Sequence, residues 1–132
     1  MADLRPFARD DLESVLELLG AEGWSSYTHD RERTMRALTA PGTVTLVAVD
    51  DGEVLGLVQV QSDGEIQAHL STIVVAKDHR RGGLARELLA VALDQAGGLR
   101  LDLISVADDF YRGLGARSLP GFRLTREQLL GG

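Results

Sequence analysis

One junction constrains the fold of this chain more than any other segment. An apolar run, 70–75, is followed by two adjacent glycines and then by a helical run, 84–96. This is the order of a strand, a tight turn and the start of a helix. The first N–H groups of a helix have no intrahelical partner, and the helix dipole is positive at that end. Because Arg80 and Arg81 adjoin the glycines, the junction predicts an anion site built from the backbone.

The composition is that of an ordinary globular protein. With 132 residues, 44% hydrophobic and 26% charged, the chain is expected to form one domain over residues 1–132. A net charge of −6 argues against binding to nucleic acid, which requires a basic face, and suits a cationic amine instead. The absence of cysteine excludes a disulfide scaffold and a thiol nucleophile, and no metal site is expected.

Neither a membrane nor a secretory signal is indicated by the sequence. No apolar run approaches the roughly 18 residues that a membrane helix needs. The N-terminal residues contain few apolar side chains and lack the core of a signal peptide. We therefore expect no membrane partner and a cytoplasmic location.

Hydrophobic periodicity predicts a strand, two helices, three antiparallel strands, a helix, a strand, a helix and closing strands. Asp10, with Glu13 three residues later, predicts a capping box at the start of the first helix. Residues 24–28 are expected to form a polar and aromatic loop. The expected strands are 4–7, 43–49, 53–61, 66–75, 99–104 and one or two within 117–124, and the helices after the first are 29–38, 84–96 and 108–114.

The glycine turn resembles a known signature. Arg80-x-x-Gly83-x-Ala85 after an apolar strand is similar to the acyl-CoA motif of the GCN5-related N-acetyltransferases, the GNAT superfamily. The predicted order of elements resembles that family over nearly the whole chain, whereas the residues match closely only over about 68–92 and 107–116. The resemblance implies an α/β, single-domain acyl-CoA N-acyltransferase fold, in which helices flank a mixed, mostly antiparallel sheet.

The resemblance also implies that acetyl-CoA is the co-substrate. Backbone amides from Arg81 to Arg86 would hold its pyrophosphate, and the strand residues would pair with the pantetheine amides like an added strand. The alternative is a solvated surface turn with no ligand. The implied cofactor-binding residues are Ile73, Val74, Val75, Arg80, Arg81, Gly82, Gly83, Leu84, Ala85 and Arg86.

A second family motif is similar to the segment 107–116. By this resemblance Tyr111 would protonate the thiolate of CoA, a role that suits a hydroxyl of pKa about 10 opposite a thiol of about 8.5. The alternative is a tyrosine packed on a helix face. The chain departs from the family at two positions: Ala116 replaces an aromatic residue, and Ile104 stands where many members have asparagine. Ser105 is a candidate replacement for that asparagine.

The strand 66–75 supplies the candidate base. A period of two places His69 on a face that begins polar and ends with Val75, opposite a face formed by residues 66, 68, 70, 72 and 74. Histidine is the side chain whose ordinary pKa lies near neutrality, and an attacking amine must lose a proton. Glu65 is the competing base, and a structural role for His69 is equally open.

The acceptor is expected to bind near the first two helices. Aromatic rings with a carboxylate suit an organic cation, although the same residues can instead cover the core and cap a helix. The candidate substrate-binding residues are Trp24, Tyr27, His29 and Asp30. The sequence thus predicts a transfer of acetyl from acetyl-CoA to a primary amine of a small molecule. The alternatives are acetylation of a protein lysine or N-terminal amine, and a CoA-binding module without turnover; a homodimer is also possible.

Overall fold

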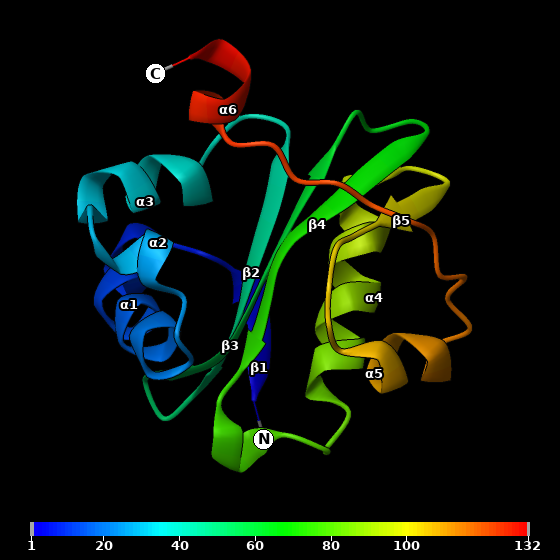
Figure 1. Cartoon of the computed structure of the whole chain (residues 1–132). Helices are drawn as coiled ribbons and strands as arrows, with labels where there is room; N and C mark the ends of the chain where they lie inside the picture. Colours follow the sequence, from blue (N-terminus) through cyan, green and yellow to red (C-terminus); the bar gives the residue numbers. More distant parts are fainter. Residues whose placement is uncertain (1, 132) are drawn as a thin grey trace.

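A five-stranded sheet forms the centre of the computed structural model, which describes residues 2–131 (Figure 1). The strands are adjacent in chain order, and every pair is antiparallel except β4 and β5, which are parallel. The mixed, mostly antiparallel sheet is therefore confirmed. The strands are β1 (Asp3–Pro6), β2 (Thr43–Asp50), β3 (Glu53–Ser62), β4 (Gln67–Val75) and β5 (Arg100–Asp102).

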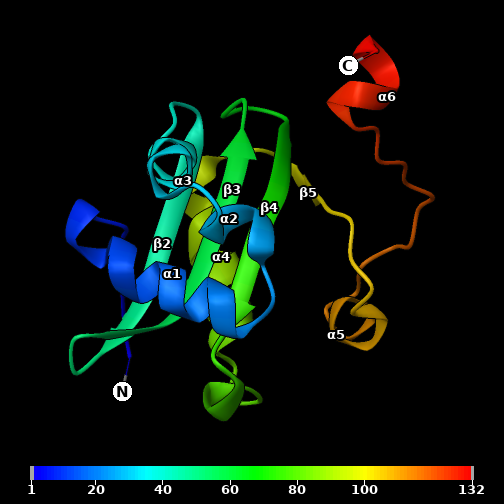
Figure 2. The same ribbon diagram turned by 60° about the vertical axis from the view of Figure 1, so that its left-hand side comes forward.

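Helices cover both faces of the sheet. Three of them, α1 (Leu12–Ala21), α2 (Ser25–Thr28) and α3 (Arg31–Leu38), lie on one face, and α4 (Leu84–Ala96) lies on the other with α5 (Asp108–Gly113) beside it (Figures 1 and 2). The helix α2 stands where a loop was expected. Short 3-10 turns occur at Arg9–Asp11 and Lys77–His79, and α6 (Arg126–Leu130) ends the described chain. Within residues 2–131 no helix is both long and apolar enough to cross a membrane.

The core consists of two apolar layers, one on each side of the sheet. Between the sheet and α1 and α3, fully buried residues such as Val15 and Leu57 pack together. On the α4 side, Val58 and Leu88 are equally inaccessible. A Cβ on Gly56 would lie 3.0 Å from Leu88 Cδ1, so the absence of a side chain at Gly56 lets α4 approach β3 closely.

A β-bulge in β4 corrects the predicted alternation of its side chains. Gln59 of β3 pairs with Thr72, and the next residue of β3 pairs with Leu70, which leaves Ser71 as an extra residue. Leu70 therefore packs on the α4 side, whereas Val74 packs with α1 and α3. The prediction that residues 66 to 74 share one face at every second position is wrong, because one inserted residue shifts the period.

The predicted closing strands within 117–124 are also wrong. These residues form no strand in the part of the chain that the structure describes, and all are exposed. Pro120 lacks a backbone donor and Gly121 is a weak strand former, so together they interrupt any ladder. An unpredicted helix, α6, follows instead. It begins with a capping box, in which Thr125 Oγ1 accepts from the Gln128 N–H at 3.1 Å and Gln128 Oε1 accepts from the Thr125 N–H at 2.9 Å.

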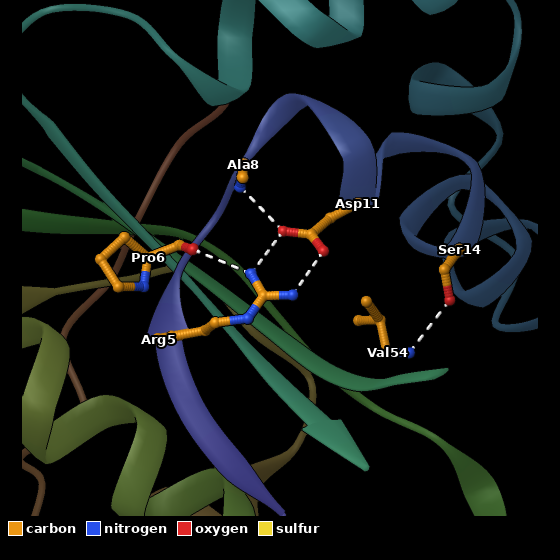
Figure 3. Close-up of polar contacts among 6 residues, drawn as sticks. All are labelled: Arg5, Pro6, Ala8, Asp11, Ser14 and Val54. Atoms are coloured by element: carbon orange, nitrogen blue, oxygen red, sulfur yellow. Dashed lines mark hydrogen bonds and ion pairs between the residues drawn. The ribbon is translucent and has the colours of Figure 1, made fainter. Parts of the chain in front are cut away.

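The entry to α1 depends on Asp11 and not on the predicted Asp10 capping box (Figure 3). The α-helix begins at Leu12, after a 3-10 turn, so Asp10 is not its N-cap. The Asp11 carboxylate accepts from the Ala8 N–H at 2.8 Å and from two Arg5 nitrogens at 2.7 Å each. Figure 3 also shows how α1 is tied to β3, since Ser14 Oγ accepts from the Val54 N–H at 3.0 Å.

Asp11→Asn is expected to weaken the acid sensitivity of folding. The bond from Arg5 is the main cause that holds the pKa of Asp11 below its ordinary 3.8, while burial acts in the opposite direction. An aspartate with a lowered pKa stabilises the fold above its ordinary pKa and loses that contribution as pH falls through the folded value. We expect Asp11→Asn to cost about 2 kcal/mol near pH 7, because charged bidentate bonds are lost, and progressively less as the pH falls below 3.8.

Urea unfolding over that pH range measures this effect. Asp10→Asn is the matched control, because Asp10 is exposed. Equal losses of unfolding free energy at both ends of the range in Asp11→Asn would show that ionisation of Asp11 does not contribute.

Candidate active site

A cleft opens where β4 and β5 separate. The two strands pair only between Gln67–His69 and Arg100–Asp102. Beyond this short ladder the chain leaves the sheet, and a cleft of about 740 Å³ lies between β4 and the segment that follows β5. One wall is formed by residues 70–75 and the opposite wall by residues 103–107 together with Phe110 and Tyr111 of α5. The turn before α4 closes one end.

The β4 wall presents a free strand edge to this cleft. Past His69, β4 has no neighbouring strand on the β5 side within residues 2–131. A free edge exposes N–H and C=O groups that an extended ligand can pair with. The predicted cofactor-binding residues Ile73, Val74 and Val75 lie on this stretch and line the cleft.

The turn before α4 leaves helix amides open. Gly83 is the N-cap, with φ +84°, and provides no side chain to cap the helix. The first intrahelical bond runs from the Glu87 N–H to the Gly83 carbonyl at 3.0 Å, so the amides of residues 84–86 have no intrahelical acceptor. A Cβ on Gly83 would meet no heavy atom within 4 Å. Residues 83–86 also line the cleft, so these amides lie beside open space in which an anion such as a phosphate can bind.

Arg81 adds backbone strain to the same turn. Its φ of +69° lies in the left-handed region, which costs a non-glycine residue about 1–2 kcal/mol. The predicted residues Arg81, Leu84, Ala85 and Arg86 all line the cleft, and Gly82 lies between them in the turn. Neither Arg81 nor Arg86 has an ion-pair partner among the described residues. Two arginines without an ion-pair partner thus line the same cleft as a set of open amides, and both kinds of group suit a phosphate.

Arg80 has a different environment from the one expected. Its Nε donates to the Val75 carbonyl at 3.1 Å, and its guanidinium forms an ion pair with Glu22 at the end of α1. Arg80 lines the cleft but shares its charge with this carboxylate. Glu22 belongs to no motif in the sequence. Its only local signal is a carboxylate two residues before the aromatic Trp24.

Tyr111 is half-buried on the wall opposite β4. Its ring packs edge-on against Phe110, with centroids 4.9 Å apart. Burial raises the pKa of the Tyr111 hydroxyl above its ordinary 10.0, and a hydrogen bond with Ser105 acts in the opposite direction. The hydroxyl therefore stays protonated at neutral pH and can donate a proton into the cleft. Ile104 lines the cleft but has no polar side-chain group. Its neighbour Ser105 also lines the cleft and is hydrogen-bonded to Tyr111.

Of the four predicted acceptor-binding residues, only Trp24 lines the cleft. The Trp24 ring packs edge-on against the Tyr27 ring, with centroids 6.0 Å apart. The Tyr27 hydroxyl is hydrogen-bonded to Thr72 Oγ1 at 2.8 Å, which anchors α2 to β4 at the bulge. His29 and Asp30 are exposed and do not line the cleft. Asp30 instead caps α3, because its carboxylate accepts from the Arg33 N–H at 3.1 Å.

The two candidate bases also lie outside the cleft lining. His69 is exposed and is the last residue of β4 that pairs with β5. The bulge separates it from Ile73 and Val75. Glu65 is exposed in the turn before β4. The structure therefore brings together the open turn, the β4 edge, Tyr111 and Trp24, but neither of these bases.

Comparisons with known proteins identify the family and the fold. Residues 6–116 match the model of the Acetyltransferase (GNAT) family. An acetyltransferase from Trypanosoma brucei is 23% identical with a TM-score of 0.76, and the match covers 95% of this chain and 99% of that one. A ribosomal-protein-alanine N-acetyltransferase from Brucella melitensis is 22% identical with a TM-score of 0.73, covering 95% and 98%. The protein AAC(6')-Iy, solved with the bisubstrate analogue CoA-S-monomethyl-acetylneamine, is 17% identical with a TM-score of 0.75, covering 96% and 97%.

At these identities the solved structures establish the shared fold. No curated protein matches the chain in sequence. The family model spans most of the chain, including the turn, the β4 edge and Tyr111. The chain therefore belongs to the GNAT family of acetyltransferases.

Proposed function

We propose that the protein transfers the acetyl group of acetyl-CoA directly to a primary amine of a small molecule. The observation that carries this proposal is the continuity of one cleft, which joins open helix amides, a free strand edge and a half-buried tyrosine hydroxyl. The similar fold of AAC(6')-Iy, solved with an analogue that contains CoA, supports the choice of co-substrate and a small acceptor.

The residues of the cleft fit the parts of acetyl-CoA. The amides of residues 84–86, together with Arg81 and Arg86, take the pyrophosphate, because these groups are open and positively polarised. The edge at Ile73 to Val75 pairs with the pantetheine amides as an added strand would. An amide near Val74 then donates to the oxygen that becomes negative during attack on the thioester.

Tyr111 completes the reaction as the acid. The attacking nitrogen forms a bond to the acetyl carbon and loses a proton, while the bond from that carbon to sulfur breaks. The Tyr111 hydroxyl supplies a proton to the departing thiolate, and its raised pKa keeps that proton available at neutral pH. No residue forms a covalent bond with the acetyl group.

His69 serves as the base in this proposal, acting through water because its side chain does not line the cleft. His69→Ala is expected to lower the rate about tenfold at pH ~7 and much less above pH ~9, where free amine is abundant. The pH profile of kcat/KM measures this effect. A loss of the same size at every pH would assign His69 a structural role and turn attention to Glu65.

Release of CoA from acetyl-CoA, measured with a panel of small primary amines, tests the proposed function. Turnover with one or more of these amines is the expected result. Turnover with peptide lysines or N-terminal amines alone would establish the alternative of a protein acetyltransferase. Tight binding of acetyl-CoA with no turnover on any amine or peptide would instead identify a CoA-binding module.

A further inference from the structure

We propose that Glu22 and Trp24 form a cation-binding site in the cleft and that this site selects a positively charged acceptor amine. The inference rests on the proposed function and deepens it, since it assigns the charge of the acceptor and names the residue that binds the charged group. It follows from which side chains line the cleft and from how each of them is held.

Glu22 is chemically distinct from every other group in the cleft. Among the described residues that line it, Glu22 is the only carboxylate, and the ionisable groups at the phosphate end are His79, Arg80, Arg81 and Arg86. The remaining lining groups are apolar or neutral. An ammonium group entering this cleft is repelled by Arg81 and Arg86 at the phosphate end, and it is attracted by one carboxylate and one indole ring.

The carboxylate of Glu22 is held in place by Arg80 through one of its two oxygens. Only 15% of its side chain is exposed, and the ion pair to Arg80 involves Oε1. Arg80 is itself held by the bond from its Nε to the Val75 carbonyl. An ionised carboxylate offers about four acceptor positions on two oxygens, so Oε2 can accept from a second cation. The arginine thus orients Glu22, and the acceptor takes the other oxygen.

Trp24 lines the same cleft as Glu22 and follows it by two residues in the chain. Its ring contacts Tyr27, and Tyr27 is tied to Thr72 of β4. Because Thr72 belongs to the cleft wall, these contacts hold the indole at the cleft without depending on the ligand. A carboxylate and an aromatic face two residues apart favour an alkylammonium group, and they disfavour an acceptor that carries its own carboxylate next to Glu22.

Calorimetric titration of the CoA-saturated protein tests this inference without turnover. The probes are cadaverine, a five-carbon diamine, and 5-aminovalerate, which has the same length but ends in a carboxylate. We expect the wild type to bind cadaverine at least tenfold more tightly than 5-aminovalerate. Glu22→Gln should weaken cadaverine binding about tenfold and remove this preference, and Glu22→Asp should restore part of it.

Glu17→Gln is the matched control, since it makes the same charge change on an exposed residue of α1 outside the cleft. Cadaverine binding should be unchanged in this variant. Titration of each variant with CoA shows that the fold and the phosphate end are intact.

Two results would overturn the inference alone: unchanged cadaverine affinity in Glu22→Gln, or a wild type that binds CoA but does not prefer cadaverine. A wild type that does not bind CoA at all would contradict the proposed function itself, so the two failures are distinguishable.

Discussion

Gly83→Glu is expected to abolish the stabilisation of the protein by acetyl-CoA. The glutamate side chain would occupy the space in front of the open amides of α4, where a Cβ at present meets no atom within 4 Å. It would also place a carboxylate where the proposal puts a pyrophosphate, so that steric and electrostatic effects act together. Ligand at about 100 times its dissociation constant adds ~2.7 kcal/mol to the wild type, enough to raise Tm by several degrees.

The backbone cost of this substitution has a control within the chain. Gly52, in the turn between β2 and β3, has φ +77° and no atom within 4 Å of its added Cβ, like Gly83. Gly52→Glu therefore imposes similar strain away from the cleft. Thermal unfolding with rising acetyl-CoA should show a normal shift for Gly52→Glu and none for Gly83→Glu. An equal shift in both variants would mean that the turn before α4 does not hold the cofactor.

Tyr111→Phe is expected to lower kcat by roughly a hundredfold to a thousandfold while acetyl-CoA binding is retained. The substitution removes the hydroxyl and keeps the ring that packs against Phe110. Because burial raises the pKa of Tyr111 above 10.0, loss of this proton should limit the wild-type rate only at pH values above the ordinary tyrosine range. The high-pH decline should therefore be present in the wild type and absent from Tyr111→Phe.

Steady-state kinetics and a thermal shift with acetyl-CoA on the same preparation separate catalysis from binding. A kcat close to that of the wild type would remove Tyr111 from the role of acid. Loss of both kcat and the thermal shift would instead assign Tyr111 to the binding of the cofactor or to the packing of α5.

Helices and strands whose own residues show a clear periodicity and clear turn residues at their ends could be predicted from the sequence. The helix 84–96 was expected at the bounds of α4, because glycines flank it and apolar residues recur at helical spacing. The hairpin of β2 and β3 followed from two β-rich runs around Asp51 and Gly52. The turn before α4 was also predictable, because an apolar run, two glycines and a helical run in that order indicate a strand, a tight turn and the start of a helix.

Features that depend on tertiary contacts were not predictable. The bulge at Ser71 arises from pairing with β3, and no local pattern in β4 marks it. The ion pair between Glu22 and Arg80 joins residues far apart in the sequence, so neither residue type signals the other. Asp30 illustrates an ambiguous signal: an aspartate before a helix suits both a ligand and a cap, and in the structure it caps α3.

The most direct test of the central claim is an NMR titration of ¹⁵N-labelled protein with acetyl-CoA. The account predicts that the largest amide shifts fall on residues 73–75 of β4 and on residues 81–86 around the start of α4, with smaller changes at Tyr111. Absence of shifts at saturating acetyl-CoA, or shifts confined to residues outside the cleft, would contradict the assignment of this cleft as the acetyl-CoA site.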